Sequence, residues 1–292
     1  MNIVIIDKKE AEIKTTTSQL IINTQKIPFN LIDTIIIEGK TTLQTQDINR
    51  LSKNGISIIL LKSNRYVASI ISAYNNKNAN LKISQYRASL KPTNIAKELL
   101  KIKINAHILH LKEHNIILNK SRYMQNINSA KTLDELLGIE GSFSKLYFSH
   151  YFKLFPKNLH NNKRTKRPPK DPLNAVMSWL YTIFYHTITV KLIASGFEPN
   201  IGYLHRPFRD HNALSSDILE VIRADINQFI FTLFNNNLLS KESFTKKGDA
   251  VYLKYEDRKS IYPYFQEFQA QLDTKITNAI TLIRSMLWRK LS

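Results

Sequence analysis

The change of pattern that decides the fold begins in residues 95–111, which read IAKELLKIKINAHILHL. Apolar side chains recur there in alternating steps of four and three, at Ile95, Leu99, Ile102, Ala106 and Leu109 and, beside them, at Ile104, Ile108 and Leu111. This spacing gathers the apolar side chains on one stripe, because an α-helix turns once in about 3.6 residues. The stretch therefore predicts a long amphipathic helix.

Helical patterns continue downstream of this stretch. They predict helices over Thr132 to Phe155, Pro172 to Ala194, Ser215 to Phe234 and Ile261 to Leu291. The chain contains only 7 glycines, which agrees with a long helical region. Residues 89–292 are therefore predicted to form one α-helical domain.

The first 75 residues have a different pattern. Short β-branched runs separated by polar residues predict strands at Ile3 to Ile6, Leu20 to Ile22, Thr34 to Ile37, Ile56 to Leu61 and Val67 to Ile71. The spacing of Leu43, Ile48 and Leu51 predicts a short helix that ends at Asn54-Gly55. We therefore predict an α+β chain with a small β-rich domain over 1–75, a polar linker over 76–88 and the helical domain over 89–292.

The balance of charge indicates a class of partner. The chain has 42 Lys and Arg against 23 Asp and Glu, a formal net charge of +19. Such a field attracts polyanions, of which nucleic acid is the commonest, although a lysine-rich surface from AT-rich coding gives the same count. The absence of cysteine excludes disulfides, Cys-ligated zinc and thiol catalysis. With no signal peptide and no apolar run of roughly 18 residues, a soluble cytoplasmic protein without a membrane partner is expected.

A basic segment interrupts the helical patterns. Two prolines, Pro168 and Pro169, disfavour helix and predict a loop. Five cations surround them, at Lys163, Arg164, Lys166, Arg167 and Lys170. A solvated connection and an arm that contacts DNA phosphates are both open interpretations.

Four acidic or imidazole groups are candidates for chemistry. Glu140 lies between Gly138 and Gly141, and glycines permit close approach of a ligand. Asp217 and Glu220 are three residues apart, so they share a helix face, and they follow His205 closely. Each has a structural alternative, because acids stabilise the start of a helix and a lone histidine is more often structural than a ligand.

Together, Glu140, His205 and Glu220 supply oxygen and nitrogen ligands of the kind that suits Mg²⁺ or Mn²⁺. An ion held by such a set polarises a phosphate and activates a water or a 3′-hydroxyl. Arg223 follows Glu220 by three residues, at a spacing that lets it orient the carboxylate. No phosphate-binding glycine loop, HExxH or GxSxG pattern competes with this interpretation.

Four segments in order resemble the CRISPR-associated integrase family, the endonucleases of spacer acquisition. Gly138 to Gly141 followed by Tyr147-Phe148 resembles its "GxEG…YF" signature. Arg167 to Ala175 is similar to its "RPPxDPxNA" segment, with Tyr181 at a following aromatic position. Gly196 to His205 is similar to its "GLDPxxGxLH" motif, and Asp217 to Arg223 to its "DLxExxR" helix. The resemblance extends over nearly the whole chain.

This resemblance implies roles for individual residues. Glu140, His205 and Glu220 fall on the family's metal-ligand positions, and Asp217 on a supporting acidic position of the catalytic set. Lys163, Arg164, Lys166, Arg167 and Arg223 are candidates for contacting nucleic acid. The resemblance further implies a homodimer formed through the β domain, assembly with a small ferredoxin-like CRISPR-associated partner, and insertion of short DNA fragments at a repeat array by transesterification.

The sequence departs from the family pattern at two places. Phe197-Glu198 stands where Leu-Asp is usual, and Asn64-Arg65 stands where a glycine turn is common. Two other interpretations use the same residues. A non-catalytic DNA-binding scaffold predicts that Glu140 and Glu220 are surface groups far apart. A repair nuclease that acts on branched DNA predicts the same site without integration.

Overall fold

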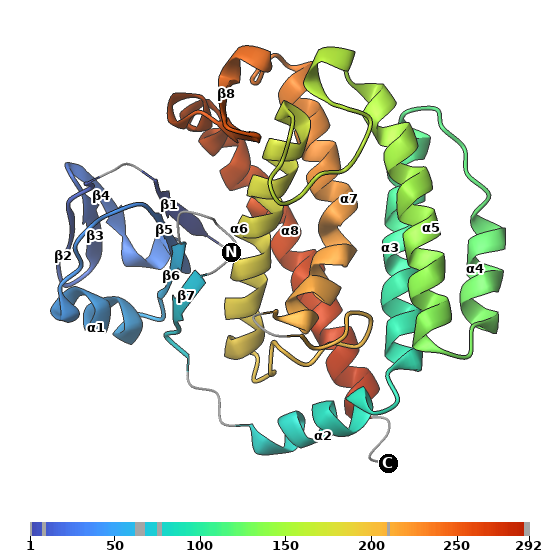
Figure 1. Ribbon diagram of the computed structural model, residues 1–292. Helices are drawn as coiled ribbons and strands as arrows, with labels where there is room; N and C mark the ends of the chain where they lie inside the picture. The colour runs from blue at the N-terminus through green and yellow to red at the C-terminus, as the bar shows by residue number, and fades with distance from the viewer. Residues whose placement is uncertain (1, 8–9, 62–67, 75–77, 209–210, 289–292) are drawn as a thin grey trace.

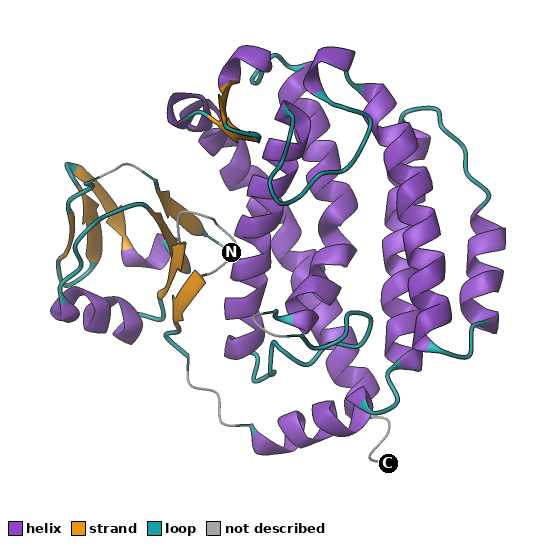
Figure 2. Cartoon of the chain, viewed as in Figure 1, coloured by secondary structure: helices purple, strands orange, loops and turns teal. Residues whose placement is uncertain are grey.

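The computed structural model describes residues 2–7, 10–61, 68–74, 78–208 and 211–288. A β-rich N-terminal domain lies beside a larger helical domain (Figure 1; Figure 2), as the α+β pattern predicted. Within the described residues, no helix has the length and apolar character needed to cross a membrane.

The N-terminal domain contains two small sheets. The first has the strand order β1-β5-β6-β7, formed by Ile3–Ile6, Thr34–Glu38, Ser57–Leu61 and Ala68–Ile71. β1, β5 and β6 are parallel and β7 is antiparallel to β6. The second sheet is an antiparallel meander of β2 (Ile13–Thr15), β3 (Gln19–Ile22) and β4 (Gln25–Pro28). Helix α1 (Thr45–Lys53) ends at Asn54, before Gly55 at φ 75°, as its sequence predicted.

The first sheet buries side chains on both faces, because successive residues of a strand point in opposite directions. On β5, Ile36 packs into the core of the helical domain, whereas Ile35 and Ile37 pack with Leu20 and Leu51 in the separate core of the β domain. The alternation of one strand therefore joins the two domains through apolar contacts.

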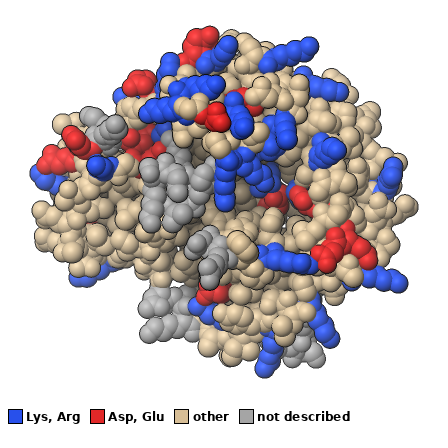
Figure 3. Space-filling model, viewed as in Figure 1, with Lys and Arg blue, Asp and Glu red and all other residues tan. Residues whose placement is uncertain are grey.

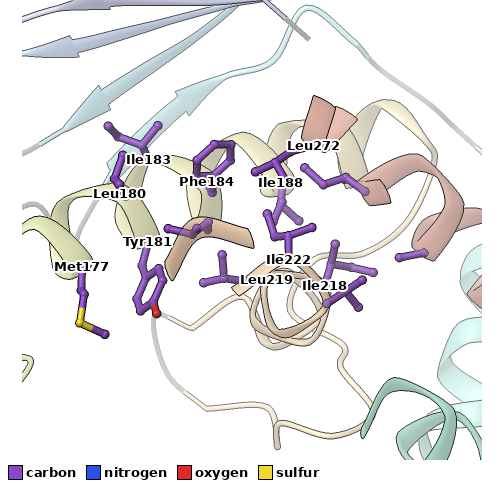
Figure 4. Packing of buried hydrophobic residues seen from close by; sticks show 14 of the residues in the cluster. Met177, Leu180, Tyr181, Ile183, Phe184, Ile188, Ile218, Leu219, Ile222 and Leu272 are labelled. Carbon is purple, nitrogen blue, oxygen red and sulfur yellow. The ribbon is translucent and has the colours of Figure 1, made fainter. Parts of the chain in front are cut away.

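The helical domain is built from seven α-helices among the described residues. These are α2 (Ala79–Ser89), α3 (Thr93–Glu113), α4 (Lys120–Ser129), α5 (Leu133–Tyr151), α6 (Pro172–Ala194), α7 (Ala213–Asn235) and α8 (Tyr255–Trp288). Apolar side chains of α6 and α7, with Leu272 of α8, interdigitate in its centre (Figure 4). α7 packs against α3, α6 and α8, so residues on its first turns are held from several sides.

Several predicted boundaries differ from the structure. The predicted linker over 76–88 is wrong for most of its length, because α2 occupies Ala79–Ser89 and Asn78 caps its start by accepting from the Leu81 N–H. A short hairpin, β8 (Phe244–Lys247) and β9 (Ala250–Leu253), is an addition inside the helical domain. Its strands have four residues each, which is too short to show a period. The expected strand start at Val67 and the Asn64-Arg65 turn lie outside the described residues.

A buried ion cluster locks the two domains together. The Arg258 guanidinium of α8 contacts Asp7 at 3.2 Å and Glu38 at 3.1 Å, both from the β domain. The Tyr262 hydroxyl donates to the same Asp7 carboxylate at 2.6 Å. We call Arg258, Asp7, Glu38 and Tyr262 the domain joint.

Candidate active site

Two of the predicted acids converge on one cation inside the helical domain. Glu140 lies in the middle of α5 and Glu220 in the first half of α7. The Lys103 ammonium of α3 forms an ion pair with Glu140 and lies 2.9 Å from Glu220 Oε2. The Ser144 hydroxyl, one turn after Glu140, donates to the same carboxylate at 2.8 Å. Three helices therefore bring two carboxylates to one point, although 80 residues separate them in sequence.

Lys103 was not predicted as a site residue. Its side chain is 1% exposed, which is rare for lysine unless the ammonium is paired. It lies on the buried face of α3 with Leu99, Leu100 and His107, whereas Leu109 of the predicted stripe is exposed. The available signal in the sequence was a lysine on the helix face that also carries Leu99 and Leu100. A search for apolar residues at helical spacing passes over such a lysine.

Arg223 orients Glu220 from the same helix. Its guanidinium lies 2.7 Å from Glu220 Oε1, one turn away, and 4.8 Å from the centre of the Tyr181 ring. Tyr181 is itself held by a hydrogen bond to Asn227 in the core. The guanidinium is mostly buried between these groups, so its first partners are the carboxylate and the aromatic face.

His205 is fixed by Asp217. The Asp217 carboxylate accepts the backbone N–H groups of Tyr203, Leu204 and His205, at 2.6, 3.1 and 2.8 Å. It also lies 2.8 Å from His205 Nδ1. Asp217 is fully buried, and its oxygens are committed to these groups. It therefore positions the loop and the imidazole, leaving Nε2 as the ring nitrogen that faces other ligands.

Gly202 allows this loop to approach α7. A Cβ atom at this position would lie 2.8 Å from the backbone carbon of Ala213 and 2.9 Å from Asp217 Oδ2. These distances are shorter than real Cβ contacts, so any larger residue displaces the loop that carries His205. The close packing of the loop against α7 therefore explains on steric grounds why glycine stands at position 202 of the "GxLH" segment.

The electrostatics favour ionised carboxylates. Burial raises the pKa of Glu220, but Arg223 and Lys103 outweigh it, and the pKa lies far below its usual range. Burial and Lys103 oppose each other at Glu140 in the same way, with a net lowering of the pKa. Burial lowers the pKa of His205, yet Asp217 raises it more, so the net shift is upward. The centre is thus a pair of stable anions beside an imidazole.

The basic segment after α5 divides into two groups. Arg164 turns inward, donating to Asn174 at 2.8 Å and to Ser178, and its guanidinium lies 5.6 Å from the Tyr181 ring centre. Lys163, Lys166 and Arg167 are exposed. Lys and Arg side chains gather over this loop on the face drawn in Figure 3. Partial burial of the Lys166 ammonium, followed by the charges of Arg223 and Arg164, lowers its pKa, and the charges of Glu220 and Glu140 oppose this shift less strongly.

The donor set fits a divalent cation that prefers oxygen. Glu220 Oε2 is buried and lies 2.9 Å from the Lys103 ammonium, and among the described residues it accepts no well-directed hydrogen bond. Carboxylates of Glu140 and Glu220 with an imidazole suit Mg²⁺ or Mn²⁺ chemically. In the described part of the chain, no three His, Asp or Glu side chains yet converge closely enough to hold an ion. The carboxylates instead converge on the ammonium.

Comparison with known proteins identifies the family. The family model for CRISPR associated protein Cas1 matches residues 4–267. The chain is 30% identical to CRISPR-associated endonuclease Cas1 1 of Thermodesulfovibrio yellowstonii, over 94% of this chain and 93% of that protein. It is 28% identical to CRISPR-associated endonuclease Cas1 of Clostridium perfringens, over 92% and 84% of the two chains.

Solved structures agree on the fold. A Cas1 protein from Thermotoga maritima superposes with a TM-score of 0.86 at 20% identity, covering 98% of this chain and 96% of that chain. A casposase bound to its integration product superposes with a TM-score of 0.82 at 19% identity, covering 98% and 90%. The order of motifs, the β-then-α architecture and these matches lead to one conclusion: the chain belongs to the Cas1 family of CRISPR associated proteins.

Proposed function

We propose that this protein is a divalent-metal-dependent DNA endonuclease and integrase that inserts short DNA fragments into a CRISPR array. The observation that carries the proposal is the convergence of Glu140 and Glu220 beside an imidazole that Asp217 holds in place. Relatives are named endonucleases, and a structural neighbour is a casposase bound to its integration product. The net charge of +19 supports a polyanionic substrate.

Glu140, Glu220 and His205 are the residues proposed to hold Mg²⁺ or Mn²⁺. When bound, such an ion supplies Lewis-acid polarisation of a phosphate and stabilises its developing charge. The protein's part is to keep the carboxylates ionised and the imidazole oriented before substrate arrives. Arg223 and Asp217 serve this purpose, because each fixes one ligand by a buried, charged contact.

The DNA is proposed to lie over the exposed cations Lys163, Lys166 and Arg167, next to the carboxylates. Phosphate contacts from such residues hold the strand in register with the site without reading its bases. A fragment's 3′-hydroxyl that attacks a phosphodiester of the array held near Glu140 and His205 would form a new 3′-O–P bond and release the target strand's own 3′-hydroxyl. Attack by water at the same phosphate would break the same bond and give hydrolysis. Correct placement of the attacking oxygen relative to the phosphate supplies much of the rate acceleration.

The proposed assembly is a homodimer formed through the β domain together with a small ferredoxin-like partner. A structural neighbour with a TM-score of 0.81 is part of a Cas6-RT-Cas1–Cas2 complex, in which this chain covers 35% of the matched polypeptide. Another neighbour, with a TM-score of 0.53, is a Cas1–DNA complex. These neighbours support contact with a second CRISPR-associated protein and with DNA, whereas the homodimer and the ferredoxin-like fold of the partner rest on the sequence resemblance.

The scaffold alternative predicts that Glu140 and Glu220 lie far apart on the surface. Their shared contact with Lys103 Nζ disfavours it. A branched-DNA repair nuclease would use the same residues. A CRISPR array found next to the gene would favour integration over repair, and looking for one requires no purified protein.

The test is a strand-transfer assay with a short duplex bearing free 3′-hydroxyls and a plasmid carrying a repeat array, with the partner present. Wild-type protein should form joined products with Mn²⁺ or Mg²⁺ and none with EDTA. His205→Ala should abolish joining and cleavage while its circular dichroism spectrum matches wild type. Full activity in the folded variant, or equal activity in EDTA, would overturn the proposal.

A further inference from the structure

Lys103 is the least exposed ammonium at the site and has no part in the ligand set proposed above. Its ammonium has three neighbours: Glu140, Glu220 at 2.9 Å and the Ser144 hydroxyl at 3.1 Å. It donates hydrogen bonds to Glu140 and Ser144 and forms an ion pair with Glu220, and as a group with donors only it suits the two carboxylates. Lys103 is 1% exposed whereas Glu140 is 23% exposed. The ammonium is therefore as buried as Glu220, whose side chain is 2% exposed, and lies further from solvent than Glu140.

The charges at this point balance without any added ion. Glu140 and Glu220 contribute two negative charges, and Lys103 and Arg223 contribute two positive charges. Two buried carboxylates facing each other without a cation repel strongly, because the interior screens charge far less than water does. Removing one partner of a buried ion pair is correspondingly destabilising. Arg223 contacts Glu220 alone among the two acids, so Lys103 is the group that joins them.

We propose that Lys103 is an internal counter-ion that holds Glu140 and Glu220 together in the metal-free protein, so that a divalent cation binds in competition with its ammonium. The inference rests on the proposed metal-dependent function and deepens it. Lys103 is a positioning residue, because it acts through the two carboxylates and is itself buried. It keeps the site assembled when empty and weakens metal binding in return.

The decisive variant is Lys103→Met, which keeps the length of the side chain and removes its charge. The matched control is Lys101→Met on the same helix, where the lysine is partly exposed and pairs with Glu98 at 2.8 Å. In EDTA at pH 8, Lys103→Met should lower Tm by about 10 °C, as expected for one buried charge left uncompensated. Lys101→Met should lower it by no more than about 2 °C, since exposed pairs contribute little.

Metal binding separates this role from simple packing. By calorimetry or manganese electron paramagnetic resonance, Lys103→Met should bind Mn²⁺ at least about tenfold more tightly than wild type, because the competing charge is gone. Mn²⁺ should also raise the Tm of this variant more than that of wild type. Lys101→Met should match wild type in both measurements. Unchanged or weaker Mn²⁺ affinity in Lys103→Met would overturn the proposal.

A double variant keeps the test informative if Lys103→Met fails to fold. Lys103→Met with Glu140→Gln leaves Glu220 and Arg223 as a balanced pair. Its metal-free Tm should recover most of the loss, which a packing role for Lys103 does not predict. No recovery would contradict the counter-ion role. These Tm measurements are made without metal, so they test the counter-ion role of Lys103 even if the wild-type protein binds no Mn²⁺. Absence of Mn²⁺ binding by the wild-type protein would overturn the proposed function instead.

Discussion

Within the described part of the chain, two buried cations each bridge two carboxylates, and they differ in what surrounds them. At the domain joint, Arg258 bridges Asp7 and Glu38 across two domains. In the helical domain, Lys103 bridges Glu140 and Glu220 from three helices. The joint is closed by Tyr262, which donates to Asp7. The helical cluster opens instead toward Glu140, at 23% exposed, and His205, at 32% exposed.

This difference separates a structural bridge from a candidate binding site. A planar guanidinium with several fixed donors suits a permanent bridge, whereas an ammonium is a point charge that another cation replaces more readily. Glu220 also has an oxygen without a well-directed hydrogen bond. A buried cation between two carboxylates therefore holds the two domains together at the domain joint. In our proposal, the same arrangement at Lys103 prepares a site for ion binding.

The largest expected effect is on stability at the joint. Arg258→Met leaves Asp7 and Glu38 without their shared cation and should lower the free energy of unfolding by about 3–5 kcal/mol. Urea unfolding followed by circular dichroism measures this loss. A decrease below about 1 kcal/mol would mean that the joint is no more than a surface-like contact.

Catalytic activity, in contrast to stability, should depend on the cluster around Lys103 and not on the domain joint. Glu220→Gln should reduce Mn²⁺-dependent cleavage by about 100-fold or more, because one charged ligand is lost from the site. Glu38→Gln, at the joint, should lower stability while activity per folded molecule stays near wild type. Similar activity losses in both variants would remove the distinction between the two clusters.

A pH effect is expected from His107, which lies next to the helical cluster. Burial, followed by the charge of Lys103, lowers the pKa of His107 to about 3. The unfolded chain binds a proton near pH 6.5 and the folded chain does not, so stability falls as pH decreases from about 6.5 toward 3. At pH 5 the contribution is about 2 kcal/mol. His107→Gln should flatten the dependence of Tm on pH across this window, and an unchanged slope would exclude His107 as its source.

A smaller effect is expected from Gly202→Ala. The added Cβ atom meets Ala213 and Asp217, so the loop carrying His205 must shift. Mn²⁺-dependent cleavage should fall by about tenfold, as is usual when a group supporting a metal ligand is disturbed. Gly141→Ala is the matched control, because nothing lies within 4 Å of its Cβ position. Equal activity in the two variants would show that the loop adjusts freely.

The smallest effect concerns the basic loop. Arg167→Gln should weaken DNA binding a few-fold and reduce the slope of log affinity against log salt by about 1. Arg164→Gln removes an inward-facing guanidinium that contacts Asn174 and Ser178, so it should change stability more than the salt slope. Fluorescence anisotropy with labelled duplex over a salt series compares them. An unchanged slope for Arg167→Gln supports a solvated connection.

The sequence predicted the long helices and the β-branched strands β1, β3, β5 and β6 well, and the remaining short elements poorly. α6 begins at Pro172 and ends at Ala194 as predicted, because a capping Asp171 and a turn at Gly196 mark its ends. The strands β2 and β4 and the hairpin β8–β9 are three or four residues long, so their composition carries no clear period. Helix α2 was missed because its sequence is polar and its caps are local contacts of Asn78.

The candidate site was predictable where residues carry family motifs and not where tertiary contacts decide. Glu140, His205 and Glu220 were selected by their order in the chain, and two of them meet at one cation. Lys103 belongs to none of the quoted motifs, since its importance arises from the packing of α3 against α5 and α7. The inward turn of Arg164 likewise depends on Asn174 and Ser178, which only the fold brings near.

The most direct measurement is anomalous diffraction at the manganese edge from crystals of the protein soaked with Mn²⁺. The account predicts one strong peak between the carboxylates of Glu140 and Glu220 and the Nε2 atom of His205, with the Lys103 ammonium displaced from the carboxylates. A peak bound elsewhere, or none at this point while the ammonium still bridges Glu140 and Glu220 at saturating Mn²⁺, would contradict it.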